Sequence, residues 1–330
     1  MFLKGTGLME AESTAKVAIV MAVYNGEQYL DDQIQSILGQ TYENWQLFIS
    51  DDCSNDNSLQ VVKKYVRSEP RIHLVLEGKH FGNAQDHFMA LLREVAGKFD
   101  YYMFCDQDDV WDSNKVQLEV EAAAKWPMDK PVLVATDLRV VSEDLSVISN
   151  SFAKYSDFSP TTAQFGNLLI ENFVTGCTVL INNCLAELAA DTPAGTYMVM
   201  HDWWFALIAK GLGQLVYLPT ATISYRQHGD NSLGAAQYGI HSILASWDWA
   251  EQCRKMCNSI RQADSFMGQY GSQLDNEKRS ETINFIGLTA HPRILRIAKL
   301  ANAHAWKTGV PRCFGEIIGI LFSRHINKDW

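Results

Sequence analysis

The sequence predicts an α/β fold, with a mostly parallel central sheet flanked by helices and a helical C-terminal region. In the first third of the chain, short β-branched apolar runs alternate with segments whose apolar residues recur every three or four positions. Strands and helices that alternate in this way form a parallel sheet covered on both faces. From about residue 235 onward the spacing is helical only, which predicts the C-terminal region.

The first strands and helices follow one another closely. A continuous apolar run predicts a strand at residues 17–23, and mostly apolar segments predict strands at residues 45–50, 72–76 and 101–105. Amphipathic spacing predicts helices between them, at residues 30–38, 59–66 and 88–95. The loops after the first, second and fourth strands are polar. Ligands bind at the carboxyl ends of the strands in parallel sheets, so these loops are expected to form the binding site.

A different pattern occupies residues 130–235. It predicts strands at residues 132–136, 138–141, 178–181, 214–217 and 221–225. Helices are predicted between them, near residues 162–170 and 203–210. We interpret this part as the second half of the same sheet, with some antiparallel pairing. The chain is then one domain over residues 1–235, followed by a helical region at 236–330.

The composition is that of an ordinary globular protein, with 330 residues of which 47% are apolar and 20% charged. The net charge of −10 argues against a nucleic-acid partner, because nucleic-acid binding needs a basic surface. The longest apolar run, residues 17–24, is too short to cross a membrane, and residues 1–10 contain no apolar signal segment. Seven cysteines without a CxxC pair indicate reduced thiols. We therefore expect a cytoplasmic protein.

The end of the chain is basic although the whole chain is acidic. Residues 291–330 contain seven basic and two acidic side chains. Apolar residues at 294–300 and 317–322 stand beside basic ones such as Arg296 and Arg324. Basic amphipathic helices bind anionic membrane surfaces, which suggests peripheral association with the inner face of the plasma membrane. The alternative is ordinary packing of these helices on the rest of the protein.

Three aspartates, Asp106, Asp108 and Asp109, follow the strand at residues 101–105. Alternate residues of an extended segment point to the same side, so Asp106 and Asp108 are candidates for one cation site. Hard divalent cations prefer oxygen ligands and often bridge to phosphate oxygens. The pattern therefore predicts a metal–diphosphate site. The alternative is a solvated acidic turn that caps the next helix through Asp112.

The loops after the first two strands carry groups suited to a nucleoside. Asp51 and Asp52 offer oxygens that can accept hydrogen bonds from a base or a ribose. Tyr24 and Asn25 precede a glycine that allows close approach of a ligand. Both loops also fit the alternative of ordinary turns closed by Asx and Ser side chains. The GxGxxG and P-loop patterns are absent, so the sequence has no dinucleotide-binding or ATP-hydrolysis fingerprint.

Two further motifs lie in the second half of the chain. Asp202 stands at a predicted helix start as a candidate general base, and the following Trp203 and Trp204 could form a wall for a sugar ring. The alternative is a capping aspartate with its tryptophans in the core. Arg226 and His228 follow the strand at 221–225 and suit a phosphate or a metal, with an ordinary polar loop as the alternative.

Together these motifs resemble the inverting family 2 glycosyltransferases of the GT-A fold, and most of all the bacterial rhamnosyltransferase-like members that build surface polysaccharides. The resemblance covers about residues 16–234. It rests on Val-Tyr-Asn-Gly at 23–26, Ser-Asp-Asp-Cys-Ser-Asn-Asp at 50–56, Phe-Gly-Asn at 81–83, Phe-Cys-Asp-Gln-Asp-Asp-Val-Trp at 104–111, Thr-Gly-Cys-Thr at 175–178, His-Asp-Trp-Trp at 201–204 and Tyr-Arg-Gln-His-Gly-Asp-Asn at 225–231. One departure is Cys53, where the family often has glycine.

The resemblance implies roles for individual residues. Nucleotide-sugar binding falls on Val23, Tyr24, Asn25, Asp51, Asp52, Asn83, Asp106, Gln107 and Arg226. The metal ligands, for Mn²⁺ or Mg²⁺, fall on Asp106, Asp108 and His228, and the adjacent Asp109 leaves open which carboxylate contacts the ion. The catalytic base falls on Asp202, and the acceptor-side candidates are Trp203, Trp204 and Gly176. Residues 16–130 would bind the nucleotide sugar and residues 131–235 would form the acceptor and catalytic half.

The implied reaction moves a sugar from a nucleotide-diphosphate donor to a glycan or lipid-linked acceptor in bacterial surface polysaccharide synthesis. The preferred assignment is L-rhamnose from dTDP-rhamnose. Attack from the face opposite the diphosphate inverts the anomeric centre, so a β-linked donor gives an α-rhamnoside. A UDP-hexose donor is one alternative. A non-catalytic nucleotide-sugar-binding subunit is another, although Asp202 argues against it. A nucleotidyltransferase would need a glycine-rich basic loop after Val23, which is absent. The oligomeric state stays open, with a homo-oligomer among the alternatives.

Overall fold

A computed structural model of the protein describes residues 15–228, 249–290 and 292–307, which form two compact units. The sheet unit contains the described residues up to Ser151, residues Thr175–Asp191 and residues 214–228. The helical unit contains residues Phe152–Val174, Thr192–Gly213 and the described residues from 249 onward. The domain boundary predicted near residue 235 lies outside the described residues.

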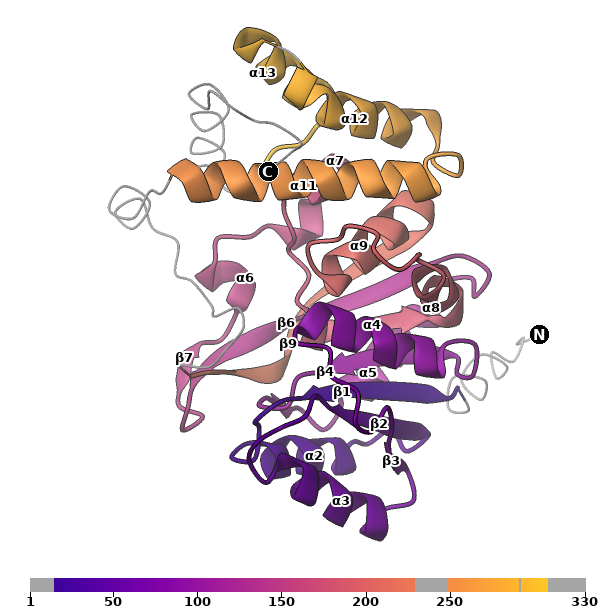
Figure 1. Ribbon diagram of the computed structural model, residues 1–330, viewed down its shortest axis with the longest axis vertical. Coiled ribbons are helices and arrows are strands. Elements are labelled where there is room, and N and C mark those ends of the chain that lie inside the picture. Colours follow the sequence, from indigo (N-terminus) through magenta and orange to yellow (C-terminus); the bar gives the residue numbers. More distant parts are fainter. Residues whose placement is uncertain (1–14, 229–248, 291, 308–330) are drawn as a thin grey trace, which may run out of the picture. The chain divides into compact units, whose positions relative to one another are not determined.

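The sheet unit is built on one nine-stranded mixed sheet (Figure 1). Its strands are β1 (Val17–Val23), β2 (Trp45–Asp51), β3 (Ile72–Leu74), β4 (Tyr101–Cys105), β5 (Val110–Trp111), β6 (Val132–Ser142), β7 (Val147–Ser149), β8 (Val179–Asn182) and β9 (Gln214–Gln227). The strand order is β3-β2-β1-β4-β8-β6-β9-β5, and β7 pairs with β6. Strands β3, β2, β1 and β4 run parallel, so the carboxyl ends of β1, β2 and β4 meet at one edge.

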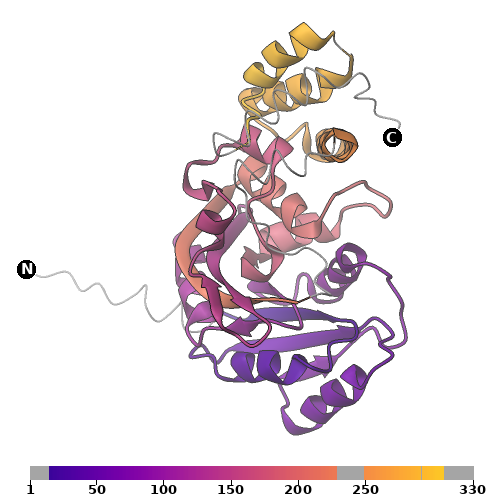
Figure 2. The same cartoon turned by 90° about the vertical axis from the view of Figure 1, so that its left-hand side faces the viewer.

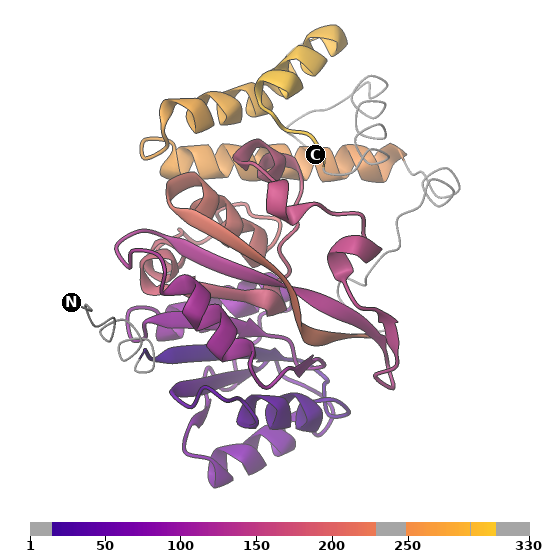
Figure 3. The same ribbon diagram turned by 180° about the vertical axis from the view of Figure 1, so that it is seen from behind.

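The predicted strands and helices of the first third are confirmed. The apolar residues of β1 from Val17 to Met21 are fully buried, as a continuous β-branched run predicts. The helices of this unit are α2 (Leu30–Leu38), α3 (Ser58–Ser68), α4 (Ala84–Val95), α5 (Lys115–Ala123) and α8 (Asn183–Ala190). Helix α4 lies in front of the sheet in Figure 1 and α5 lies in front of it in Figure 3, so they cover opposite faces.

The second half of the sheet is more continuous and more antiparallel than its sequence pattern. Residues 132–136 and 138–141 form the single strand β6, and residues 214–217 and 221–225 belong to the single strand β9. Irregular pairing between Thr136 and Arg139 explains the break in the pattern. Strand β8 is antiparallel to both β4 and β6. The proposed cap Asp112 is wrong: Asn114 precedes α5, and Asp112 forms an ion pair with Arg139.

The helical unit contains α6 (Phe152–Tyr155), α7 (Phe165–Ile170), α9 (His201–Leu212), α11 (Trp249–Tyr270), α12 (Asn276–Ile286) and α13 (Arg293–Asn302). Its core includes the fully buried rings of Trp204, Phe266 and Phe285. Helix α12 packs on α11, and α13 packs on α12 (Figure 2). None of the helices described in this structure is both long and apolar enough to cross a membrane.

The predicted amphipathic segment at 294–300 falls on α13, whereas 317–322 lies outside the described residues. Arg296 and Leu300 are buried, and Lys299 Nζ donates to Asn284 Oδ1 of α12 at 3.0 Å. Leu295 stays half exposed. The buried side of α13 therefore packs within the helical unit, and its exposed side is the part that a membrane could contact.

Candidate active site

The loop after β1 and the loop after β4 are joined by one side chain. Gln107 Oε1 accepts a hydrogen bond from Tyr24 N at 2.8 Å, and Gln107 Nε2 donates to Tyr24 O at 2.9 Å. Gly26 leaves room for this amide, because a Cβ at Gly26 would lie 2.4 Å from Gln107 Oε1. The predicted ligand-binding residue Gln107 thus uses its amide to connect two loops, while the Tyr24 ring stays about half exposed.

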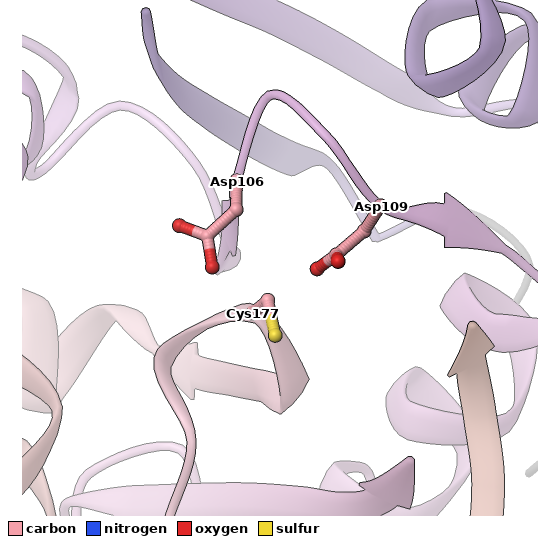
Figure 4. A group of neighbouring side chains, drawn as sticks. All are labelled: Asp106, Asp109 and Cys177. Carbon is pink, nitrogen blue, oxygen red and sulfur yellow. The ribbon is translucent and has the colours of Figure 1, made fainter. Parts of the chain in front are cut away.

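Three side chains converge beneath the loop after β4 (Figure 4). The carboxylates of Asp106 and Asp109 point toward the same space, and the thiol of Cys177 approaches them from η2 (Gly176–Thr178). One ligand atom from each of the three residues lies within 4.8 Å of the other two. Asp109 is fully buried; its Oδ1 accepts from Arg226 N at 3.2 Å, and its Oδ2 has no hydrogen-bond partner among the described residues.

The electrostatics of this cluster suit a hard divalent cation. Burial, and then the negative charges of Asp108 and Asp106, raise the pKa of Asp109 well above its usual value. Burial, and then Asp109 and Asp106, raise the pKa of the Cys177 thiol, which therefore stays protonated beside Asp109. Oxygen ligands suit Mg²⁺ or Mn²⁺, whereas a protonated thiol is a poor ligand. The crowded carboxylates and the unpartnered Oδ2 thus fit a cation held by oxygen.

The other two predicted metal ligands form a separate pair beside this cluster. His228 Nε2 and Asp108 Oδ2 are 2.8 Å apart, and both side chains are mostly buried. The imidazole stacks on the ring of Tyr29 with the centroids 4.7 Å apart. Tyr29 in turn donates through its hydroxyl to Glu143 Oε1 at 3.0 Å. The structure therefore groups Asp106 with Asp109 and groups Asp108 with His228.

Arg226 lies at the end of β9 and holds several segments together. Its Nε donates to Asp108 O at 2.9 Å, and one terminal nitrogen donates to Glu143 O at 2.7 Å. The other terminal nitrogen forms an ion pair with Asp32 on α2 at 2.9 Å. The guanidinium also lies over the Tyr29 ring, 4.8 Å from its centroid. Only 5% of Arg226 is exposed, so its polar atoms serve the loops around it.

The two aspartates after β2 have different surroundings. The Asp52 carboxylate accepts hydrogen bonds from the backbone N–H groups of Phe81 and Gly82, and it also contacts His80 Nδ1. It therefore shapes the loop before α4. Asp51 Oδ2 accepts from Ser54 N at 3.1 Å, but Asp51 Oδ1 is buried and has no hydrogen-bond partner in the described part of the chain. Asp51 is thus the better candidate for contact with a ligand.

Three other predicted binding residues have local structural contacts. Asn83 caps α4, where its Oδ1 accepts from Asp86 N at 2.8 Å. Asn25 adopts a positive φ of 50°, and its Oδ1 accepts from Asn55 N at 2.8 Å. Val23 accepts from Asp52 N through its carbonyl at 2.8 Å. The contacts of Asn25 and Val23 connect the loops after β1 and β2.

The predicted base lies in the helical unit, in the first turn of α9. Asp202 is 7% exposed, and the helix cap is Met200 rather than Asp202. Asp202 Oδ1 accepts from Trp203 N at 2.6 Å and from Asn172 Nδ2 at 3.1 Å. The sequence reasoning assigned no role to Asn172, because a single asparagine 30 residues upstream carries no recognisable pattern.

The acceptor-side candidates have different positions. Trp203 is 8% exposed and donates through Nε1 to Leu168 O at 2.6 Å. Trp204 is fully buried and donates through Nε1 to Thr192 Oγ1 at 3.0 Å. Both indole rings thus pack inside the helical unit, as in the core alternative. Gly176 begins η2 in the sheet unit, directly before Cys177. Cys177 lies in a motif that the sequence singled out, but its contact with Asp109 could not be read from that motif.

Comparison with known proteins identifies the group to which this arrangement belongs. The model of glycosyl transferase family 2 matches residues 18–178. The dTDP-rhamnosyl transferase RfbG of Shigella flexneri is 28% identical over 261 residues, which covers 75% of this chain and 86% of that protein. Residues 18–178 form a domain of glycosyl transferase family 2. The matched region holds the loops after β1, β2 and β4 and extends through Cys177.

Two further similarities agree with this family and with the GT-A fold. The UDP-Glc:alpha-D-GlcNAc-diphosphoundecaprenol beta-1,3-glucosyltransferase WfgD of Escherichia coli is 28% identical over 170 residues, which is 51% of this chain and 61% of WfgD. The mannosyltransferase PcManGT of Pyrobaculum calidifontis, solved with GDP-Man and Mn²⁺, aligns with a TM-score of 0.53 and 13% identity over 88% of this chain and 73% of that one. The protein has the GT-A fold.

Proposed function

We propose that this family 2 glycosyltransferase is a metal-dependent inverting enzyme that uses a nucleotide-diphosphate sugar, best dTDP-rhamnose, and a glycan or lipid-linked acceptor. The observation that carries the proposal is the pair of the half-buried Asp106 and the buried Asp109 at the carboxyl end of a parallel strand, beside a loop with an unpartnered Asp51 oxygen. The similarity to a dTDP-rhamnosyl transferase over most of both chains supports the choice of donor.

The sheet unit would bind the donor. Asp106 and Asp109 would hold Mn²⁺ or Mg²⁺, with the pair Asp108 and His228 beside them. When bound, the cation would offset negative charge on the leaving diphosphate. Asp51 would accept a hydrogen bond from the nucleoside, next to the exposed Tyr24 ring. Gln107 would keep the nucleoside loop and the acidic loop in register through its two hydrogen bonds to Tyr24.

The helical unit would supply the base. In the proposed step, the acceptor oxygen forms a bond to the sugar C1 while the bond from C1 to the diphosphate oxygen breaks. Asp202 takes the proton of the acceptor hydroxyl, and the nucleoside diphosphate leaves with the bonding electron pair. Attack opposite the leaving group inverts C1. The hydrogen bonds from Trp203 N and Asn172 to Oδ1 support a fixed orientation of this carboxylate.

The substitution Asp202→Asn tests the role of this base. Asparagine keeps an oxygen that accepts from Trp203 N, so folding and donor binding should stay close to those of the parent. Loss of a general base should lower kcat by about 10²–10⁴-fold. Asp275→Asn is a matched control, because Asp275 caps α12 with its Oδ1 and asparagine preserves that cap. A rate within a few-fold of the parent for Asp202→Asn would place the base elsewhere.

The donor is tested by thermal unfolding with a panel of nucleotide sugars. A ligand at about 100 times its dissociation constant stabilises the folded state by about 2.7 kcal/mol, so the preferred donor should raise Tm most. dTDP-rhamnose should exceed UDP-glucose and GDP-mannose in this panel. Because the chain is also similar to WfgD, a UDP-Glc glucosyltransferase, a UDP-hexose is the chief alternative donor. A larger Tm increase with UDP-glucose would overturn the rhamnose assignment.

Three further assays test the remaining alternatives. Excess chelator should abolish transfer and Mn²⁺ should restore it, and full turnover in chelator would contradict metal dependence. Donor binding without transfer to any tested acceptor would favour a non-catalytic binding subunit. For membrane association through α13 and the following residues, the full chain should float with anionic liposomes, and a folded chain that stays in solution would contradict it.

A further inference from the structure

The amide of Asn172 has a defined orientation. Its Oδ1 accepts from Val174 N at 3.0 Å, and its Nδ2 donates to Val174 O at 2.8 Å. This reciprocal pair decides which end of the amide carries the nitrogen, because a flipped amide would lose both bonds. The remaining hydrogen of Nδ2 is then donated to Asp202 Oδ1, which lies 3.1 Å from Nδ2. The two hydrogen bonds with the Val174 backbone thus orient the Asn172 N–H group toward the Asp202 carboxylate.

We infer that Asn172 is a positioning residue that holds the Asp202 carboxylate in the orientation from which it accepts the acceptor proton. The inference rests on the proposed role of Asp202 as the base. Proton transfer requires the base oxygen within hydrogen-bond reach of the hydroxyl, and displacement by about 1 Å can lower the rate about 100-fold. Asp202 Oδ1 accepts hydrogen bonds from both Asn172 Nδ2 and Trp203 N, and these two bonds leave the Asp202 side chain few alternative rotamers.

A second hydrogen bond joins the segment that carries Asn172 to the helix turn that carries Asp202. The ring of Trp203, the residue after Asp202, donates through Nε1 to Leu168 O at the end of α7. Asn172 follows α7 by two residues, so the segment that carries the donor and the turn that carries the carboxylate are joined at two points. The contact of Asn172 with Asp202 is therefore part of a fixed local structure.

The substitutions Asn172→Ala and Asn172→Asp test this inference. Alanine removes the donor together with both bonds to Val174. Aspartate keeps the acceptor for Val174 N but places a second carboxylate beside Asp202, which disfavours the ionised base. Both variants should lower kcat by about 10- to 100-fold with little change in the KM of the donor. Asn172→Asp should also shift the acid limb of the pH–rate profile toward higher pH.

His201, which precedes Asp202 on α9, and Glu171, which precedes Asn172, are titratable and buried, and both are unchanged in these variants. The matched control is Asn167→Ala. Asn167 is also half buried, and its amide accepts from Gln164 N at 2.6 Å and donates to Trp306 O at 2.7 Å, without contact to Asp202. A loss of stability without a loss of kcat is expected for this control.

The double variant Asn172→Ala with Asp202→Asn completes the design. If Asn172 acts through Asp202, its removal should lower the rate no further once Asp202 is asparagine. The inference is overturned if Asn172→Asp retains the parent kcat and pH profile while Asp202→Asn is inactive, or if Asn172→Ala and Asn167→Ala lower kcat equally. An active Asp202→Asn variant would instead overturn the proposed function.

Discussion

The bridge between the loop after β1 and the loop after β4 can be broken from either side. Gln107→Ala removes the amide that accepts from Tyr24 N and donates to Tyr24 O. Gly26→Ala places a Cβ 2.4 Å from Gln107 Oε1 and 2.5 Å from its Cδ, so the amide must move away. Both changes therefore remove the same two hydrogen bonds by different routes.

The size of the effect follows from those two bonds. A hydrogen bond contributes about 0.5–1.5 kcal/mol to stability, so Gln107→Ala should lower the free energy of unfolding by about 1–3 kcal/mol. The half-exposed position of Gln107 favours the lower half of that range. Gly26→Ala should lower it by a similar amount. In a chain that already lacks Gln107, Gly26→Ala should be neutral, or stabilising by a few tenths of a kcal/mol through the unfolded state.

Urea unfolding of the two single variants and the double variant measures this coupling. We expect the double variant to match Gln107→Ala, which gives a coupling energy of about 1–2 kcal/mol. Gly39→Ala is the control, because its Cβ would have no neighbour closer than 3.4 Å and Gly39 is exposed. Additive losses within about 0.5 kcal/mol would refute the view that Gly26 is needed to make room for the Gln107 amide.

Three other predictions use buried titratable groups. Lys115 and Glu119 form a fully buried ion pair, so Lys115→Met or Glu119→Leu alone should lower the urea-unfolding free energy by about 3–5 kcal/mol, whereas the double variant should be near neutral. Burial lowers the pKa of His201 to about 3, so below pH 6.5 the unfolded chain binds a proton that the folded protein does not. Acidification from pH 6.5 to 5 should therefore lower the unfolding free energy of the parent by up to about 2 kcal/mol more than that of His201→Phe. Urea unfolding of both proteins at the two pH values measures this difference. The raised pKa of Asp109 reflects burial and neighbouring carboxylates, so Asp109→Asn should raise Tm in chelator and abolish the Tm increase that Mn²⁺ gives the parent; an unchanged Mn²⁺ shift would exclude Asp109 as a ligand.

The strands that position the candidate site could be predicted because each is a mostly apolar and mostly buried strand of the parallel part of the sheet. Strand β1 is the clearest case, since Val17 to Met21 face only other protein atoms. Strands β5 and β7 contain two and three residues, which is too short for any periodicity to appear. The general place of the site followed from the sheet rule, because β1, β2 and β4 are parallel neighbours.

The partners within the site could not be predicted in the same way. The sequence places Asp106, Asp108 and Asp109 in one loop, but the turn decides which of them face each other. The structure turns Asp109 toward Asp106 and Cys177, and it turns Asp108 toward His228. Such choices depend on contacts between residues far apart in the chain, and spacing within a motif carries no information about them.

Arg226 forms hydrogen bonds with Asp108 and Asp109 in the loop after β4, although it is translated much later than that loop. It meets Asp109 across 117 residues and Asp32 across 194 residues. During translation these aspartates therefore emerge from the ribosome long before Arg226 does. Contacts of such sequence separation form late, and until β9 docks the nascent loop keeps its repelling carboxylates apart in water. The proposed cation site would then form in one step, when the last strand of the sheet unit is added.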